Sequence, residues 1–215
     1  MKELIILGAS GFGREVAWLV ERINQKSLVW NLLGFVDDNP ELHGKDVNGY
    51  PVLGGCEALA SYPESYAVCA VGSAKIRRKI IDKVKCLLPT QKFATLIDPT
   101  VETSALVRIG DGSIICAHNI LTVNIEIGAH VIINLDCTIG HDAVIEDFVT
   151  VYPSANISGN THIGEGSELG TGMQIIQGKT IGYNSIIGAG AVVIKDIPEN
   201  CVAVGAPAKT IKVNE

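Results

Sequence analysis

Aliphatic residues recur at every sixth position through the second half of the chain. The series has no exception from its first member to its last: Ile109, Ile115, Leu121, Ile127, Ile133, Ile139, Ile145, Val151, Ile157, Ile163, Leu169, Ile175, Ile181, Ile187 and Val193. Neither a helix nor a simple strand has a strict period of six. The residue two places before each aliphatic residue is usually small, as at Cys137 and Ala155. Each six-residue unit therefore predicts a short strand with two inward side chains.

The rest of each unit must form a turn. Glycine directly follows the aliphatic residue in many units, at Gly110, Gly128, Gly140, Gly164, Gly170, Gly182 and Gly188. We assign these glycines to the turn because glycine tolerates turn conformations best. Each unit is then one short strand plus one corner. Such units stack into a solenoid with a dry aliphatic interior and strands about 4.8 Å apart.

The first part of the chain follows a different pattern. LIILGASGFGREVAWLVERI predicts a buried strand, a glycine-rich turn and an amphipathic helix. WNLLGFVDDNPELHG predicts a second strand that ends at Asp37 and Asp38, and YAVCAVGSAKIRRKII predicts a third strand and helix. This alternation is typical of a small parallel, Rossmann-like α/β sheet. We expect one domain over residues 1–95 and a second over residues 96–215.

Candidate ligand contacts follow the three predicted strands of the first domain. They are the turn from Gly8 to Gly13, the pair Asp37–Asp38, and Gly72–Ser73. Open α/β sheets bind ligands at the carboxyl ends of their strands, and backbone N–H groups at a helix start suit a phosphate. The carboxylates suit a ribose or uracil, and the alternative for them is a solvated turn before Pro40. The glycine spacing departs from the dinucleotide fingerprint, which argues against a nicotinamide cofactor.

Composition and charge exclude several classes of function. The net charge is −6 and no basic block offsets it, which argues against a nucleic-acid partner. No apolar run approaches membrane-spanning length, and the first residues, MKELIILGAS, reach a glycine too soon for a signal peptide. The six cysteines are scattered, which fits buried thiols better than disulfides or a zinc site. We expect a cytoplasmic protein.

Four stretches together resemble one family over nearly the whole chain: GASGFGREV, GFVDDNPELHGKDVNGYPVLGG, AVGSAKIRRKI and NLDCTIGHDAVIEDFVTVYPSANISGN. They resemble the hexapeptide-repeat sugar acetyltransferases, a group that includes sialic acid O-acetyltransferases and UDP-4-amino-sugar N-acetyltransferases. The resemblance implies a left-handed parallel β-helix with three units per coil, acetyl-CoA as co-substrate, a sugar or sugar-nucleotide acceptor and a homotrimer. The tail with Gly205, Pro207 and Ala208 is similar to a segment near coenzyme A in the family, or it caps the last coil.

The resemblance also implies roles for individual residues. An outward histidine is usually an ordinary surface residue, and we keep that interpretation for His43, His118, His130 and His162. The resemblance implies another role for His141, because the matching histidine is the general base in the family. The resemblance implies that Asp142 orients His141 and that Asn134 hydrogen-bonds the nucleophile or the oxyanion. It implies coenzyme contacts at Thr150, Gly159, Thr171 and Ala189, and sugar-nucleotide contacts at Ser10, Gly11, Phe12, Asp37, Asp38 and Gly72. Relatives carry histidine where Thr150 and Phe12 stand.

The chemistry of acetyl transfer agrees with a histidine in this role. A nucleophile that attacks a thioester must lose a proton, and an imidazole can accept it near neutral pH. Carbonic-anhydrase-like solenoids need three zinc-binding histidines, including an H-x4-H pair that this sequence lacks. The GGxGTR-type loop of sugar nucleotidyltransferases is also missing, and a non-catalytic scaffold is the remaining alternative. The paired aspartates favour the amine of a UDP-4-amino-sugar as acceptor, with O-acetylation of sialic acid or another sugar as the alternative.

Overall fold

The computed structural model describes residues 1–213 and divides the chain into two compact units. The first is Met1–Pro99 and the second begins at Thr100. This division falls four residues later than the boundary expected from the sequence. Residues 214 and 215, which end the predicted second domain, lie outside the described residues. In the described part of the chain, no helix combines the length and the apolar character needed to cross a membrane.

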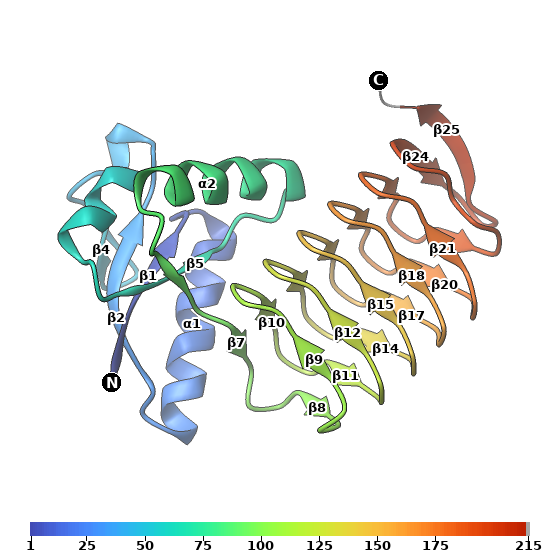
Figure 1. Cartoon of the computed structure of the whole chain (residues 1–215), viewed down its shortest axis with the longest axis horizontal. Coiled ribbons are helices and arrows are strands. Elements are labelled where there is room, and N and C mark those ends of the chain that lie inside the picture. Colours follow the sequence, from blue (N-terminus) through green and yellow to red (C-terminus); the bar gives the residue numbers. More distant parts are fainter. Residues whose placement is uncertain (214–215) are drawn as a thin grey trace. The chain divides into compact units, whose positions relative to one another are not determined.

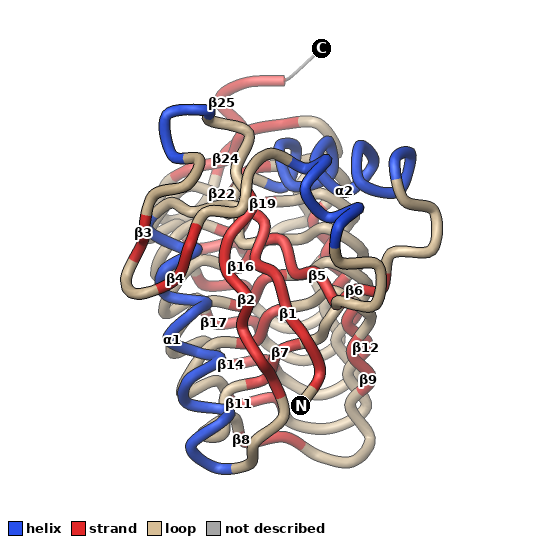
Figure 2. The backbone as a smooth tube through the Cα atoms, turned by 90° about the vertical axis from the view of Figure 1, so that its left-hand side faces the viewer, coloured by secondary structure: helices blue, strands red, loops and turns tan. Residues whose placement is uncertain are grey.

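The first unit is built on a parallel sheet with the strand order β2-β1-β5-β6 (Figure 2). Its strands are β1 (Lys2–Leu7), β2 (Trp30–Val36), β5 (Tyr66–Cys69) and β6 (Lys92–Phe93), and its α-helices are α1 (Gly11–Lys26) and α2 (Ala74–Leu87). Shorter elements complete the unit: η1 (Pro40–Leu42), β3 (Asp46–Val47), β4 (Tyr50–Pro51), η2 (Cys56–Ser61) and β7 (Leu96–Ile97). The predicted small parallel α/β sheet is confirmed.

Strand β1 forms the centre of this sheet because its last four residues are wholly apolar. Residues Leu4 to Leu7 are at most 1% exposed. The strand leads into α1 through Gly8, whose φ of +102° favours glycine. A Cβ on Gly13 would collide with the carbonyl oxygen of Gly8, so α1 can pack directly on this turn only with glycine there. The glycine-rich segment therefore places the start of α1 at the carboxyl end of β1.

The second unit is a parallel solenoid of two-residue strands (Figure 1). The strands are β8 (Glu102–Thr103), β9 (Arg108–Ile109), β10 (Ile114–Ile115), β11 (Ile120–Leu121), β12 (Glu126–Ile127), β13 (Ile132–Ile133), β14 (Thr138–Ile139), β15 (Val144–Ile145), β16 (Thr150–Val151), β17 (Asn156–Ile157), β18 (His162–Ile163), β19 (Glu168–Leu169), β20 (Gln174–Ile175), β21 (Thr180–Ile181), β22 (Ile186–Ile187) and β23 (Val192–Val193). The unit ends with β24 (Cys201–Val204), which pairs parallel to β22, and β25 (Lys209–Val213), which pairs antiparallel to β24.

From β8 to β20, each strand pairs in parallel with the strand eighteen residues further along, as Ile115 does with Ile133 and Ile139 with Ile157. Within the described residues the ladders form three faces of the solenoid. We call them the β13 face (β10-β13-β16-β19-β22), the β14 face (β8-β11-β14-β17-β20-β23) and the β15 face (β9-β12-β15-β18-β21). Three six-residue units therefore make one coil. The predicted architecture, an α/β domain followed by a parallel β-solenoid, is confirmed.

The interior of the solenoid has the composition that the period predicts. The aliphatic residue of each unit and the small residue two places before it both point inward. Ile133, Ile139, Cys137 and Ala143 are at most 1% exposed. Where the small residue is a serine, its hydroxyl donates to a backbone carbonyl, as Ser113 does to Gly128 at 2.9 Å. The interior therefore buries apolar surface, and the serine hydroxyls within it are hydrogen-bonded to backbone carbonyls.

The explanation for the glycines that follow the aliphatic residues was wrong. Their backbone is not left-handed, because positive φ occurs two residues later, as at Asp142 (58°) and Gly166 (69°). The backbone of the next coil lies directly against these glycines instead. A Cβ on Gly140 would lie 2.5 Å from the backbone nitrogen of Gly159. These positions require glycine for space between coils and not for turn conformation.

Two glycine substitutions distinguish these explanations. A Cβ on Gly164 would lie 2.5 Å from the nitrogen of Tyr183, whereas Gly178 faces open space with a φ of +71°. We predict that Gly164→Ala lowers the free energy of unfolding by about 1–3 kcal/mol because it forces two coils apart. Gly178→Asn should change it by less than about 0.5 kcal/mol, since asparagine tolerates this backbone. Denaturant unfolding measures both, and equal losses would contradict the role assigned to Gly164.

Candidate functional site

A histidine and an aspartate form a hydrogen-bonded pair at the corner between β14 and β15. His141 Nδ1 lies 2.7 Å from Asp142 Oδ2. The two side chains are 48% and 46% exposed, so the pair can be reached from solvent. Asp142 has a φ of 58°, in the left-handed region that aspartate adopts more readily than most residues. We call the edge of the solenoid between the β14 and β15 faces, where this pair lies, the dyad edge.

The preceding coil contributes a partner to the pair. The amide of Asn124 donates from Nδ2 to Asp142 Oδ1 at 3.1 Å. The hydrogen bond with His141, and secondly the one with Asn124, lower the pKa of Asp142 below its usual value. Asp142 is therefore ionised at neutral pH and can only accept a hydrogen bond, so the proton between the two side chains belongs to Nδ1 of His141. This arrangement leaves Nε2 of His141 as the basic nitrogen.

The imidazole of His141 lies over Gly159 in the following coil. A Cβ on Gly159 would lie 2.5 Å from Nε2 and 2.7 Å from Cε1 of that ring. The φ of Gly159 is not in the left-handed region, so glycine is needed here for space and not for conformation. Among the residues predicted from the sequence, the structure brings together His141, Asp142 and Gly159.

Other predicted residues lie on a different edge of the same solenoid. Asn134, Thr171 and Ala189 follow β13, β19 and β22, so they occupy the edge between the β13 and β14 faces. Thr171 and Ala189 are exposed. Asn134 Oδ1 accepts a hydrogen bond from the backbone nitrogen of Leu135 at 2.8 Å. The group of this side chain that can donate to a ligand is therefore the amide nitrogen, Nδ2. One chain therefore does not bring Asn134 to His141.

Thr150 differs from the other predicted coenzyme contacts. It lies within the β13 face, on β16, and it is 0% exposed. A coenzyme could touch this side chain only if the side chain became uncovered. In this structure Thr150 therefore has no accessible surface for the coenzyme contact that the resemblance implies.

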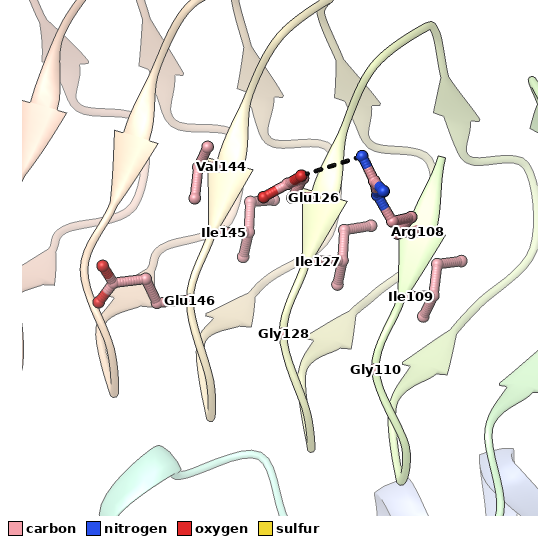
Figure 3. Close-up of a pocket in the computed structure, with 9 residues that line it drawn as sticks. All are labelled: Arg108, Ile109, Gly110, Glu126, Ile127, Gly128, Val144, Ile145 and Glu146. Atoms are coloured by element: carbon pink, nitrogen blue, oxygen red, sulfur yellow. Dashed lines mark ion pairs between the residues drawn. The ribbon is translucent and has the colours of Figure 1, made fainter. Parts of the chain in front are cut away.

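A groove runs across the β15 face and over the turns that follow its strands, at Gly110, Gly128 and Glu146 (Figure 3). It is open, has a volume of about 500 Å³, and has Ile127 and Ile145 in its lining. Arg108 and Glu126 form an ion pair of 3.3 Å on it. An adjoining hollow of about 410 Å³ shares Arg108, Glu126 and Val144 and is also lined by Asn124 and Asp142. The hollow, and not the groove itself, therefore reaches the carboxylate of the pair.

In the first unit, the turns that follow β1 and β2 are joined by Asp37. Its Oδ2 accepts from the backbone nitrogen of Ala9 and its Oδ1 from that of Asn39, both at 2.9 Å. The contact with Asn39 is the local turn that the alternative interpretation expected, and the contact with Ala9 fixes the glycine-rich turn. Both carboxylate oxygens thus already have backbone donors, which a ribose or base would have to share.

Asp38 faces α2 and η2. Its Oδ2 pairs with Lys83 Nζ at 2.7 Å, and its Oδ1 accepts from the backbone nitrogen of Cys56 at 3.1 Å. The hydrogen bond from Lys83 is the largest cause of the lowered pKa of Asp38. This carboxylate therefore ties β2 to the elements that follow it.

The start of α1 has the features of an anion site. Ser10 is the N-cap residue but its side chain makes no capping hydrogen bond, and the first turn holds no acidic residue. Ser10 and Gly11 are exposed, and Phe12 is partly buried. The first N–H groups of a helix lack intrahelical partners and favour a negative charge. Within residues 1–213, no cluster of three or more His, Cys, Asp or Glu side chains could hold a metal ion.

Known proteins match nearly the whole chain, across the first unit and the solenoid. Residues 3–84 match the PglD N-terminal domain family. The GDP-perosamine N-acetyltransferase of Escherichia coli O157:H7 is 34% identical over 215 residues, which span 96% of this chain and 95% of the relative. The chain belongs to the family of acetyl-CoA-dependent sugar N-acetyltransferases. The resemblance inferred from the sequence is confirmed.

Solved structures of acetyltransferases are similar to this chain over nearly its whole length. Perosamine N-acetyltransferase of Caulobacter crescentus, solved as a histidine-to-asparagine variant with CoA and GDP-perosamine, is 27% identical with a TM-score of 0.89, covering 99% of this chain and 98% of that one. The acetyltransferase domain of PglB from Neisseria gonorrhoeae is 33% identical with a TM-score of 0.87, covering 98% and 100%. The same domain has also been solved with acetyl coenzyme A.

Sequence reasoning missed two residues that shape this sugar N-acetyltransferase. Asn124 was not singled out, although it bonds the Asp142 carboxylate. Arg77 is 0% exposed and donates from Nη1 to the carbonyls of Val71 and Gly72, at 2.8 and 3.0 Å. It thereby fixes the turn after β5. The sequence pattern could have identified Arg77, because it lies on the same buried face of α2 as Ala74, Ile81 and Val84.

The expectation for His130 was wrong. His43, His118 and His162 are exposed as predicted, but His130 is only 3% exposed. Its ring stacks on that of Phe148, eighteen residues later, with 5.0 Å between centroids. The side chain lies between coils, and the stacked rings cover each other.

Proposed function

We propose that this N-acetyltransferase transfers the acetyl group of acetyl-CoA to the amine of a UDP-linked 4-amino-sugar, with His141 as general base. The observation that carries the proposal is the 2.7 Å pair of His141 with Asp142, whose basic nitrogen Nε2 lies over Gly159. A base oriented by a carboxylate, with room around its free nitrogen, suits the removal of a proton from an attacking nucleophile. No covalent acetyl-enzyme is needed.

The transfer proceeds in two bond changes on one carbonyl carbon. The free-base amine attacks the thioester carbonyl, and Nε2 of His141 takes a proton from the nitrogen as the C–N bond forms. Asp142 stabilises the resulting imidazolium. The C–S bond then breaks, and the imidazolium returns its proton to the departing thiolate of CoA. The amide Nδ2 of Asn134 is the proposed donor to the oxyanion that forms in between.

The nucleotide of the acceptor is proposed to bind the first unit. The uncapped start of α1 suits its diphosphate, and the turn fixed by Asp37 supports that surface. UDP is proposed because the stretches quoted above resemble the UDP-4-amino-sugar N-acetyltransferases. The E. coli and C. crescentus relatives are named for GDP-perosamine, so a GDP carrier is the competing possibility.

Substrate tests decide the acceptor. We predict acetyl-CoA consumption with a UDP-4-amino-sugar, weaker kcat/KM with the GDP-linked sugar, and negligible turnover with the matching 4-hydroxy sugar. For the amine, kcat/KM should rise with pH through the base titration and again as the free-amine fraction grows. Faster acetylation of the GDP-linked sugar would replace the UDP assignment. Faster acetylation of a sialic acid or of the 4-hydroxy sugar would overturn the assignment of an amine as the acceptor group.

A second prediction concerns the base. His141→Ala should lower kcat by about 10²–10⁴-fold with little change in acetyl-CoA affinity, because the base acts in the transition state. Asp142→Ala should lower kcat by a smaller factor. His162→Ala is a matched control, because His162 also pairs with a carboxylate, Glu146 Oε1, at 2.7 Å and is similarly exposed. Steady-state kinetics with calorimetric acetyl-CoA binding measure these effects. Near-normal turnover of His141→Ala would refute the mechanism.

Assembly is the third part of the proposal. Asn134, Thr171 and Ala189 lie on one edge of the solenoid and His141 on another, so they can serve one site only if a second copy supplies one set. In a closed cyclic trimer, every copy receives the missing set of residues from a neighbour.

We predict that sedimentation velocity shows a trimer. Mixed trimers of His141→Ala and Asn134→Ala chains should regain part of the activity that each variant lacks. A fully active monomer would contradict the assembly.

A further inference from the structure

We infer that Asn124 is a positioning residue for the reaction at His141 and acts through Asp142. The inference rests on the proposed base function of that histidine. The carboxylate of Asp142 lies between two donors, with Oδ1 bonded to Asn124 Nδ2 at 3.1 Å and Oδ2 to His141 Nδ1 at 2.7 Å. A carboxylate held through one oxygen can rotate about its Cβ–Cγ bond. The second hydrogen bond, from the preceding coil, fixes its plane.

The stacking of the coils delivers this contact. Asn124 and Asp142 occupy the same place in successive coils and have nearly the same left-handed backbone, with φ of 55° and 58°. Their side chains therefore leave the edge in parallel, one coil apart. Asparagine is common in this conformation for backbone reasons alone, as at Asn184 with φ 52°. The bond to the reacting pair distinguishes Asn124 from that general preference.

The exposure of the pair gives this bond its importance. Asp142 is 46% exposed, so water competes for its oxygens and the protein cannot hold the carboxylate by burial. Asn124 occupies Oδ1 with a neutral donor and leaves Oδ2 to His141. Loss of the amide would let the carboxylate turn away from Nδ1, and Nε2 would then spend less time in the orientation needed for proton transfer.

Asn124→Gly in the full-length protein tests the contact without straining the backbone, because glycine accepts a φ of 55°. We expect kcat to fall about 5- to 10-fold, in keeping with the loss of an exposed hydrogen bond to a charged group, while acetyl-CoA affinity stays unchanged. Asn124→Asp should lose more, because it places two carboxylates together. Asn184→Gly makes the same backbone change on another edge and should keep wild-type kcat. Thermal unfolding should show similar Tm values for both glycine variants.

A double-mutant cycle separates positioning from a structural role. If Asn124 acts through Asp142, Asn124→Gly should have no further effect on kcat in the Asp142→Ala background. An equal loss in both backgrounds would overturn the inference, because it would show an effect independent of the carboxylate. Wild-type kcat for Asn124→Gly beside a slow Asp142→Ala would overturn this inference alone. Wild-type kcat for both His141→Ala and Asp142→Ala would instead overturn the proposed base function.

Discussion

The parallel pairing of residues eighteen apart is the constraint on which the second unit depends. It stacks every residue on the one in the same place of the neighbouring coil, at the spacing of adjacent strands. Inner places must then be filled by small and aliphatic side chains that match their neighbours in the column. Where one coil approaches the next most closely, as at Gly140 and Gly164, even a methyl group does not fit. The amino-acid preferences along the second unit follow from this single geometric rule.

The same register builds the dyad edge. Asn124, the His141–Asp142 pair and Gly159 come from three successive coils, and they meet because the coils are in register. Asn124 orients the carboxylate from one side, and Gly159 leaves room for the imidazole on the other. The rule also sets a limit, since residues on different edges of one solenoid stay apart. The separation of Asn134 from His141 is a consequence of the fold and argues for a site completed by another copy.

The strict period made the solenoid predictable from sequence because each inner position repeats the same physical demand. The pair at His141 could be identified only through the family resemblance, since an outward histidine has no distinctive pattern of its own. Contacts between coils were missed because they depend on the register. His130 occupies an outward place in its unit, yet Phe148 in the next coil covers it. In the first unit, the partner of Asp38 is Lys83, forty-five residues away, and no local pattern links them.

The division between inner places and corners explains how a regular fold can carry a specific site. Corner side chains contribute little to the apolar column, so a corner can change from Val123 to His141 to Gly159 in successive coils without disturbing Ile139 or Ile157 beneath. The two-oxygen bridge at Asp142 uses this freedom, because left-handed corners admit asparagine and aspartate at little cost. The backbone geometry that the solenoid requires for stacking thus favours residue types able to orient a histidine. Function then needs a change at only a few corners of an otherwise repetitive scaffold.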